Sequence, residues 1–176
     1  GVSPAQLRAS DGDEALARHR RGLDVACHVI AFADGVAVHV NPFEWHVHHG
    51  NGFNPTTLGL EIEGMYQGGL SRPRKSGEVP LRWKTIRAAR EAIDYMIALG
   101  KKRGIILTEI YAHRQSSSDR RADPGEEIWK KVVLGHAVKK HGLETHPELA
   151  LPASNRRNGP GRPLPLVWDP LATAAY

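Results

Sequence analysis

The chain has 176 residues, of which 40% are hydrophobic and 24% are charged. These values predict a globular protein with a buried core, and no apolar run approaches the ~20 residues that a membrane-spanning helix needs. The formal net charge of +5 favours a polyanionic partner, so nucleic acid, an anionic cell-wall polymer and a membrane surface all qualify at first.

The first predicted element is a short helix over residues 13–21. Its acids lie at the start and its cations at the end, which suits the helix macrodipole, and Gly22 ends it. We expect His19 to face solvent on this helix. Because the chain opens on Gly1 and not on Met, we also expect the natural protein to extend further at this end.

A β-hairpin is predicted next. Residues 24–32 are rich in β-formers, Asp34-Gly35 is a typical hairpin turn, and residues 36–40 form the partner strand. The single cysteine, Cys27, excludes an internal disulfide. Within an apolar strand it is expected to be a buried, inert thiol.

The segment 41–55 is predicted to be a loop that lines a groove. Four aromatic rings gather there within five residues: Trp45, His46, His48 and His49. A metal cluster is a second interpretation, but neighbouring histidines without a strand or helix to orient them bind a metal loosely.

A strand follows at residues 57–63. Leucine and isoleucine alternate there with Gly59, Glu61 and Glu63, so the polar face is either solvated or functional. A carboxylate such as Glu61 most commonly pairs with a lysine at the surface, and Glu63 is expected to lie at the surface.

The second half of the chain predicts two helices on a mixed sheet. A long helix is expected over 81–102, a strand over 105–111, and a second helix over 124–140 that Pro124 opens. Residues 143–176 are proline-rich and basic, and are expected to form an extended tail with a docked anchor at Val167-Trp168. The fold class is therefore α/β (α+β), with a domain over 1–142 and a tail over 143–176.

His113, Arg121 and Asp123 follow the predicted strand at fixed offsets. An imidazole and a carboxylate ten positions apart on a folded loop can both reach one Zn²⁺, with the charge of Arg121 beside it. The alternative is structural: His113 finishes a strand, Arg121 pairs with a surface carboxylate, and Asp123 caps the helix after it. Spacing alone does not separate the two.

Two segments together resemble the type 2 N-acetylmuramoyl-L-alanine amidases, a family that includes phage amidase lysozymes and peptidoglycan recognition proteins. The first runs from Val25-Ala26-Cys27-His28 through Asp34-Gly35, Val40-Asn41-Pro42-Phe43, His49 and Asn54 to Leu58-Gly59-Leu60-Glu61-Ile62-Glu63-Gly64. The second is His113, Arg121 and Asp123-Pro124-Gly125.

The resemblance implies a role for each matching residue. His113 and Asp123 match two of three zinc ligands, and Glu61 matches the catalytic acid-base carboxylate of the bacterial branch. Arg121 stands where the family usually has an oxyanion-stabilising lysine. His28 and His49 match pocket-lining positions, and together with Trp45 and Asn54 they are expected to bind substrate.

The family's first zinc ligand is a histidine on an N-terminal strand that would precede Gly1. His28 does not replace it, because His28 aligns with the second strand. Three explanations stay open: residues upstream of Gly1 carry it, the strand is supplied otherwise, or the protein binds without cutting. We favour the first.

The resemblance thus implies a zinc-dependent amidase that cleaves between N-acetylmuramic acid and L-alanine of peptidoglycan. We expect an endolysin-like, antimicrobial protein, phage-encoded or secreted and cell-wall-directed. The alternative is a non-catalytic peptidoglycan-binding domain. We expect no nucleic-acid partner, since the basic residues lack interleaved aromatics and a reading helix, and no membrane span.

Overall fold

The computed structural model describes residues 19–67, 69–154 and 159–170. The chain forms two compact units, which are treated separately below. The described part of unit 1 comprises residues 19–49, 54–63 and 82–105, and that of unit 2 comprises residues 50–53, 64–67, 69–81, 106–154 and 159–170.

Unit 1 is built on a three-stranded mixed sheet in the order β2-β1-β3. Strand β1 pairs antiparallel with β2 and parallel with β3, which places Glu61 opposite Ile30. Gly35, with a φ of 103°, allows the turn between the first two strands. The strands are β1 (Val29–Ala31), β2 (Ala37–His39) and β3 (Leu60–Ile62). The predicted hairpin and the mixed α+β architecture are confirmed.

The predicted strands were too long. The ladders cover three residues each, inside the expected ranges 24–32, 36–40 and 57–63. The strand predicted over 105–111 is wrong: in the described chain this segment forms an isolated bridge between Glu109 and Glu144. Its backbone groups bond to Glu144 at 2.9 Å instead of joining the sheet.

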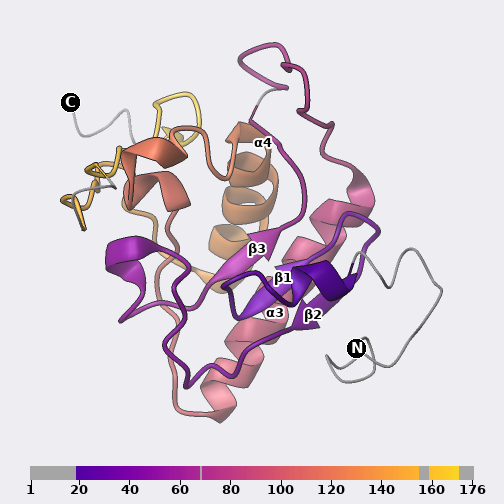
Figure 1. Cartoon of the computed structure of the whole chain (residues 1–176), viewed down its shortest axis with the longest axis vertical. Helices are drawn as coiled ribbons and strands as arrows, with labels where there is room; N and C mark the ends of the chain where they lie inside the picture. The colour runs from indigo at the N-terminus through magenta and orange to yellow at the C-terminus, as the bar shows by residue number, and fades with distance from the viewer. Residues whose placement is uncertain (1–18, 68, 155–158, 171–176) are drawn as a thin grey trace. The chain divides into compact units, whose positions relative to one another are not determined.

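Helix α3 (Trp83–Lys102) packs against the strands of unit 1 (Figure 1). Its buried positions include Ile86, Ala89 and Ile93, the stripe that helical periodicity predicts. The helix ends at Lys102, and Gly104, two residues further on, has a φ of 76° that does not continue the helical path. This element matches its prediction to within two residues at each end.

The core of unit 1 contains Cys27, Ile30, Phe32 and Val38. Burial, and next the charge of Glu61, raise the pKa of Cys27 to about 12, so the thiol is buried and unreactive as expected. The prediction that His19 faces solvent is wrong, because the residue is buried. Its Nε2 lies 2.8 Å from Asp34 Oδ2, and its ring contacts Phe32. Residues 13–18 of the predicted first helix lie outside the described residues.

Unit 2 contains one continuous helical segment of three parts. These are α4 (Glu126–Ile128), the π-helix η4 (Trp129–Val138) and α5 (Lys139–His141). The predicted helix over 124–140 is therefore present, but it begins after Gly125. Pro124 precedes the first turn and does not open it.

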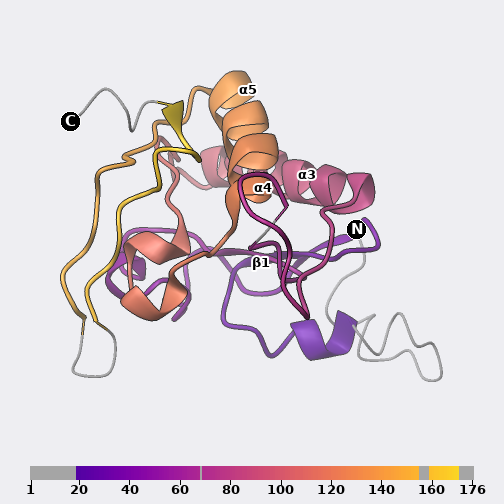
Figure 2. The same cartoon turned by 90° about the horizontal axis from the view of Figure 1, so that it is seen from above.

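Two extended segments, 143–154 and 159–170, run side by side in unit 2 (Figure 2). The amide of Gly161 donates to Leu151 O at 2.7 Å, and the amide of Leu164 donates to Pro147 O at 2.7 Å. Trp168 is buried with Ala112, Trp129, Val133 and Leu164. The domain boundary at 142/143 stays a prediction.

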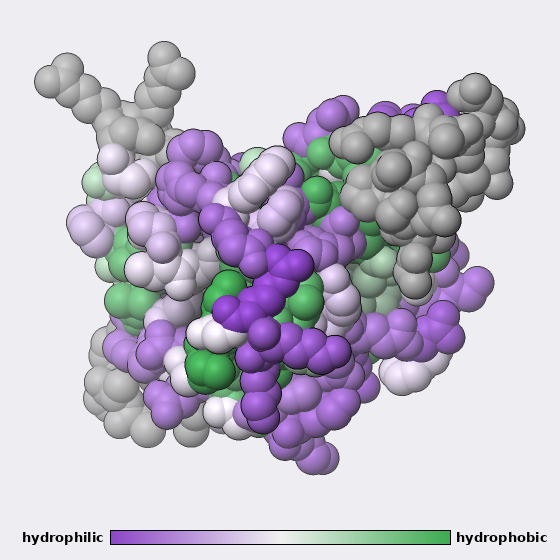
Figure 3. Space-filling model, turned by 90° about the horizontal axis from the view of Figure 1, so that it is seen from below, coloured by the Kyte–Doolittle hydropathy of each residue, from purple (hydrophilic) through white to green (hydrophobic). Residues whose placement is uncertain are grey.

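Hydrophobic and hydrophilic side chains are interspersed on the surface in Figure 3. The largest exposed apolar side chains include Trp45, Trp83 and Ile106, which are 62%, 64% and 67% exposed. Across the described residues, no helix combines the length and apolarity that crossing a bilayer requires.

Candidate functional site

Unit 2 brings His113 and Asp123 together. His113 Nδ1 lies 3.2 Å from Asp123 Oδ2, and both side chains are partly open to solvent. Zinc bonds of about 2.0 to 2.1 Å in tetrahedral geometry place neighbouring ligand atoms about 3.3 Å apart. One nitrogen and one carboxylate oxygen at this spacing fit two positions around a Zn²⁺ ion.

A buried glutamine fixes the turn that carries His113. The 3-10 turn His113–Gln115 ends on Gln115, which is 0% exposed. Its Oε1 accepts from the Ala112 amide at 2.8 Å, and its Nε2 donates to His146 O at 2.6 Å. The histidine therefore stands on a turn whose backbone has little freedom.

Backbone contacts also hold Asp123. The amide of Arg114 donates to Asp123 O at 3.1 Å. The Asp123-Pro124 peptide bond is cis, and Gly125 has a φ of 96°. A Cβ on Gly125 would overlap the carbonyl oxygen of Tyr66, so the backbone here needs a glycine.

The structural alternative for Asp123 is not what unit 2 shows. The residue that caps the helix is Gly125, and no side chain caps it. The carboxylate of Asp123 lies beside His113 instead. Arg121 is exposed and has no ion pair among the described residues of its unit, so it does not serve to neutralise a surface acid there.

Arg114 connects the two ends of this loop. Its Nη1 donates to the carbonyl oxygen of Arg121, and its guanidinium lies 5.1 Å from the centroid of the Trp168 ring. Burial, and next the charge of Arg162, lower the pKa of Arg114. The sequence did not indicate a role for Arg114, because the neighbouring Arg162 lies 48 positions further along the chain.

Glu61 belongs to unit 1. It lies at the centre of β3, where its side chain is exposed while Leu60 and Ile62 are half-buried. Glu63, expected at the surface, is half-buried and accepts a hydrogen bond from the Ala33 amide at 2.8 Å. The exposed face of β3 therefore presents Glu61, whereas Glu63 holds a turn.

His28 uses both ring nitrogens within unit 1. The Gly59 amide donates to Nδ1 at 2.9 Å, so Nε2 carries the proton and donates to Trp45 O at 3.1 Å. Burial lowers the pKa of His28, and the residue is 1% exposed. A substrate contact through these nitrogens would compete with both bonds, and its predicted role in binding stays a prediction.

His49 is held in place by its neighbours. Its Nδ1 lies 2.8 Å from Val47 O, and its Nε2 lies 2.8 Å from Thr57 Oγ1. A Cβ on Gly59 would come within 2.6 Å of His49 Cγ, so the ring packs against a position that only glycine allows. The ring also meets that of His28 edge-on, with centroids 5.4 Å apart.

Trp45 and Asn54, the other predicted substrate residues, lie on the same loop region of unit 1. The Trp45 side chain is 62% exposed. Asn54 Nδ2 lies 3.4 Å from His48 Nδ1. The rings of His46 and His48 contact each other edge-on. Among the described residues, no metal-ligating group of three includes the histidines of this loop.

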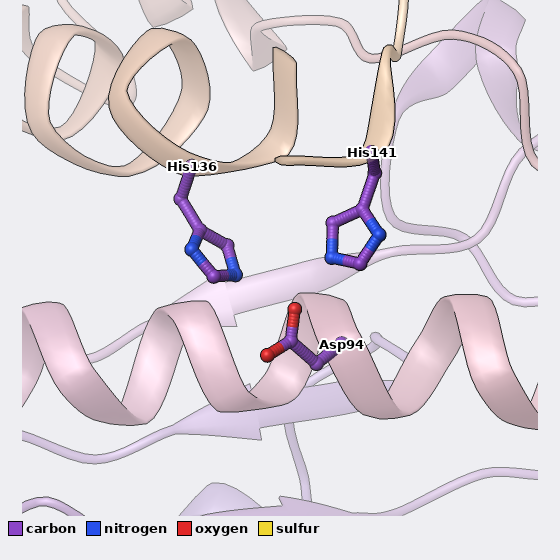
Figure 4. A group of neighbouring side chains, drawn as sticks. All are labelled: Asp94, His136 and His141. Carbon is purple, nitrogen blue, oxygen red and sulfur yellow. The ribbon is translucent and has the colours of Figure 1, made fainter. Parts of the chain in front are cut away.

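A second pair of histidines lies on the helical segment of unit 2. His136 and His141 project from the same segment, with ring centroids 5.6 Å apart (Figure 4). The π-helix brings positions five apart close together. Asp94, also labelled, lies on α3 in unit 1.

Two buried carboxylates tie the loop 69–79 to the helical segment within unit 2. Glu126 accepts from Ser71 and Lys130, and Glu127 accepts from Arg74 at 2.6 Å and Lys131 at 2.8 Å. Burial acts to raise each carboxyl pKa, but these hydrogen bonds outweigh it and the pKa of each is lowered.

Both pKa values are lower in the folded state than their ordinary value of 4.5. The ionised carboxylates therefore stabilise the fold fully at pH values above about 4.5, and this stabilisation is lost as the pH falls through the pKa of the folded state. We expect the free energy of unfolding, measured in urea, to fall by about 1 to 3 kcal/mol between pH 7 and pH 3 as these hydrogen bonds are lost. The double variant E126Q/E127Q should lose less over that range, and an identical pH dependence would contradict the assignment.

The family model for N-acetylmuramoyl-L-alanine amidase matches residues 3–126. The match covers more than half of the chain and includes β1, β3, His113 and Asp123. With its mixed sheet and helices, this α+β chain belongs to the N-acetylmuramoyl-L-alanine amidase family. No match was found among curated proteins or among solved structures.

The family assignment supports, in general terms, an amide-bond hydrolase that acts on peptidoglycan. Members are amidases of peptidoglycan, and the domain that defines them is present here. The helical segment beyond residue 126, with His136 and His141, and the paired segments 143–154 and 159–170 lie outside the matched residues.

Proposed function

We propose that the protein is a zinc-dependent amidase that hydrolyses the bond between N-acetylmuramic acid and L-alanine in peptidoglycan. The observation that carries the proposal is the 3.2 Å separation of His113 Nδ1 and Asp123 Oδ2 inside the region that matches the family. A surface role for these two side chains would not need the buried support that Gln115 and Gly125 give them.

His113 would bind the metal through Nδ1 and Asp123 through Oδ2. When bound, Zn²⁺ would supply a Lewis acid that activates water and polarises the scissile carbonyl. The donor set of histidine and carboxylate suits zinc.

Glu61 would accept a proton from the attacking water and return it to the leaving nitrogen. The water oxygen then bonds to the lactyl carbonyl carbon, the carbon–nitrogen bond breaks, and L-alanine leaves as an amine. Arg121 would face the negative charge that develops on the carbonyl oxygen. Its guanidinium is exposed and forms no ion pair among the described residues of unit 2, which supports this role.

The direct test is to incubate the full-length protein with purified peptidoglycan and zinc and to measure free L-alanine amino termini. We expect their release in step with the loss of turbidity. Release of reducing sugars instead would identify a glycosidase. Binding to the cell wall without new amino termini would favour the non-catalytic recognition domain.

We further propose an endolysin-like role, directed at cell walls from a phage or secreted source. The positive net charge of +5 supports it, because a basic protein associates more rapidly with anionic wall polymers.

A further inference from the structure

Two arginines of unit 2 are held close together by the backbone. The amide of Arg162 donates to Arg114 O at 2.8 Å. Arg114 follows His113 directly, whereas Arg162 lies on the segment 159–170, outside the residues that match the family. The pair therefore joins the loop of the candidate metal ligands to a part of the chain that the family model does not describe.

Two contacts within unit 2 hold the guanidinium of Arg114. Trp168 covers one face of it at 5.1 Å from the ring centroid, and its Nη1 donates to Arg121 O. The N–H groups of a guanidinium lie in its own plane and point outward from its edges, so contact with an aromatic ring does not use them. These groups form the fork that binds two oxygens of one anion.

Neither arginine has its hydrogen bonds satisfied by the protein. In the described part of the chain, the buried side-chain nitrogens that lack a partner are Nε of Arg114 and Nε of Arg162. Neither guanidinium forms an ion pair with a carboxylate in the described residues of unit 2. An unpartnered buried donor costs free energy, and like charges repel.

We propose that Arg114 and Arg162 form a binding site for a carboxylate group, and that its ligand is a carboxylate of the peptide in peptidoglycan. A planar carboxylate matches the guanidinium fork, supplies the missing acceptors and offsets the repulsion of the two charges. The identity of the ligand rests on the proposed function. The site itself rests on the unsatisfied donors.

The test follows the arginine Nε–H resonances of the full-length protein by NMR during titration. The probes are an N-acetylated alanine tripeptide with a free carboxyl terminus, the same tripeptide with a carboxamide terminus, and inorganic phosphate. We expect a saturable shift at Arg114 and Arg162 with the free carboxylate. The carboxamide should produce none, and phosphate a weaker response.

Variants sharpen the experiment. R162Q should weaken carboxylate binding at least tenfold. R162K keeps the charge without the guanidinium fork, and its affinity for the carboxylate should lie between that of R162Q and that of the parent protein. R87Q on helix α3 removes the same charge elsewhere and should leave binding unchanged. Circular dichroism checks that each variant is folded.

Three results would overturn the proposal: equal binding of the carboxamide peptide, tighter binding of phosphate than of the peptide, or no saturable shift with any probe. Unchanged binding by folded R162Q would do so as well. Because no step of the titration requires hydrolysis, an inactive enzyme that still binds the carboxylate would refute the proposed function and leave the site standing.

Discussion

E61Q is expected to abolish peptidoglycan cleavage, with a loss of about 10² to 10⁴-fold in kcat/KM. The amide of glutamine cannot accept the proton of the attacking water, so general acid-base catalysis is lost. Glu61 is exposed at the centre of β3, so a substitution of similar size should not disturb the fold. The measurement is the rate of release of free L-alanine amino termini at saturating zinc.

E63Q is the matched control for this experiment. Glu63 directly follows β3, two residues from Glu61, and accepts a hydrogen bond from the Ala33 amide, a bond that the glutamine oxygen can still accept. This variant should keep its activity. Full activity in E61Q, with bound zinc and circular dichroism unchanged in both variants, would remove Glu61 from the mechanism.

D123A is expected to lose zinc. Removal of the carboxylate that lies 3.2 Å from His113 Nδ1 takes away one protein ligand, and we expect the affinity to fall by more than about 100-fold, beyond the effect of changing a group outside the metal's own ligands. Elemental analysis of the purified full-length protein gives the zinc content per chain. Hydrolysis should fall with it.

D119A tests whether any acid on this loop has the same effect. Asp119 is exposed and accepts a hydrogen bond from Ser117. Its pKa is lowered chiefly by that bond. This variant should bind zinc as the parent does. If D123A also keeps its zinc, the ligand assignment is contradicted.

Local patterns predicted the elements that short-range forces define. The stripe of Ile86, Ala89 and Ile93 identifies α3, because a helix buries the residues that its own periodicity aligns. The sequence predicts the hairpin at Gly35 equally directly, because its turn needs a residue with positive φ. In both cases the information lies within a few residues.

Tertiary contacts determined the elements that were predicted wrongly. The apolar segment 105–111 has the composition of a strand, but its partner is Glu144 and not the sheet. His19 looked like a solvated helix residue, but Asp34 lies 2.8 Å from it. The local sequence around the segment 105–111 and around His19 does not indicate that Glu144 and Asp34 are their partners.

The candidate site divides in the same way. His113 and Asp123 were predicted as neighbours from a ten-residue loop, and they are neighbours; their role as zinc ligands stays a prediction, as do the roles of Glu61 and Arg121. Gln115 was missed, because a buried glutamine in a serine-rich loop looks like solvent-exposed polar sequence. Its acceptors at His146 and Leu149 lie more than thirty positions away.

The buried thiol of Cys27 has a practical consequence. It is the single cysteine of the sequence, and its raised pKa, about 12, keeps it protonated at neutral pH. Maleimides and other thiolate-selective reagents should therefore modify it only during transient opening of unit 1. The rate of alkylation of Cys27 therefore measures how often the three-stranded sheet opens locally, without an engineered label.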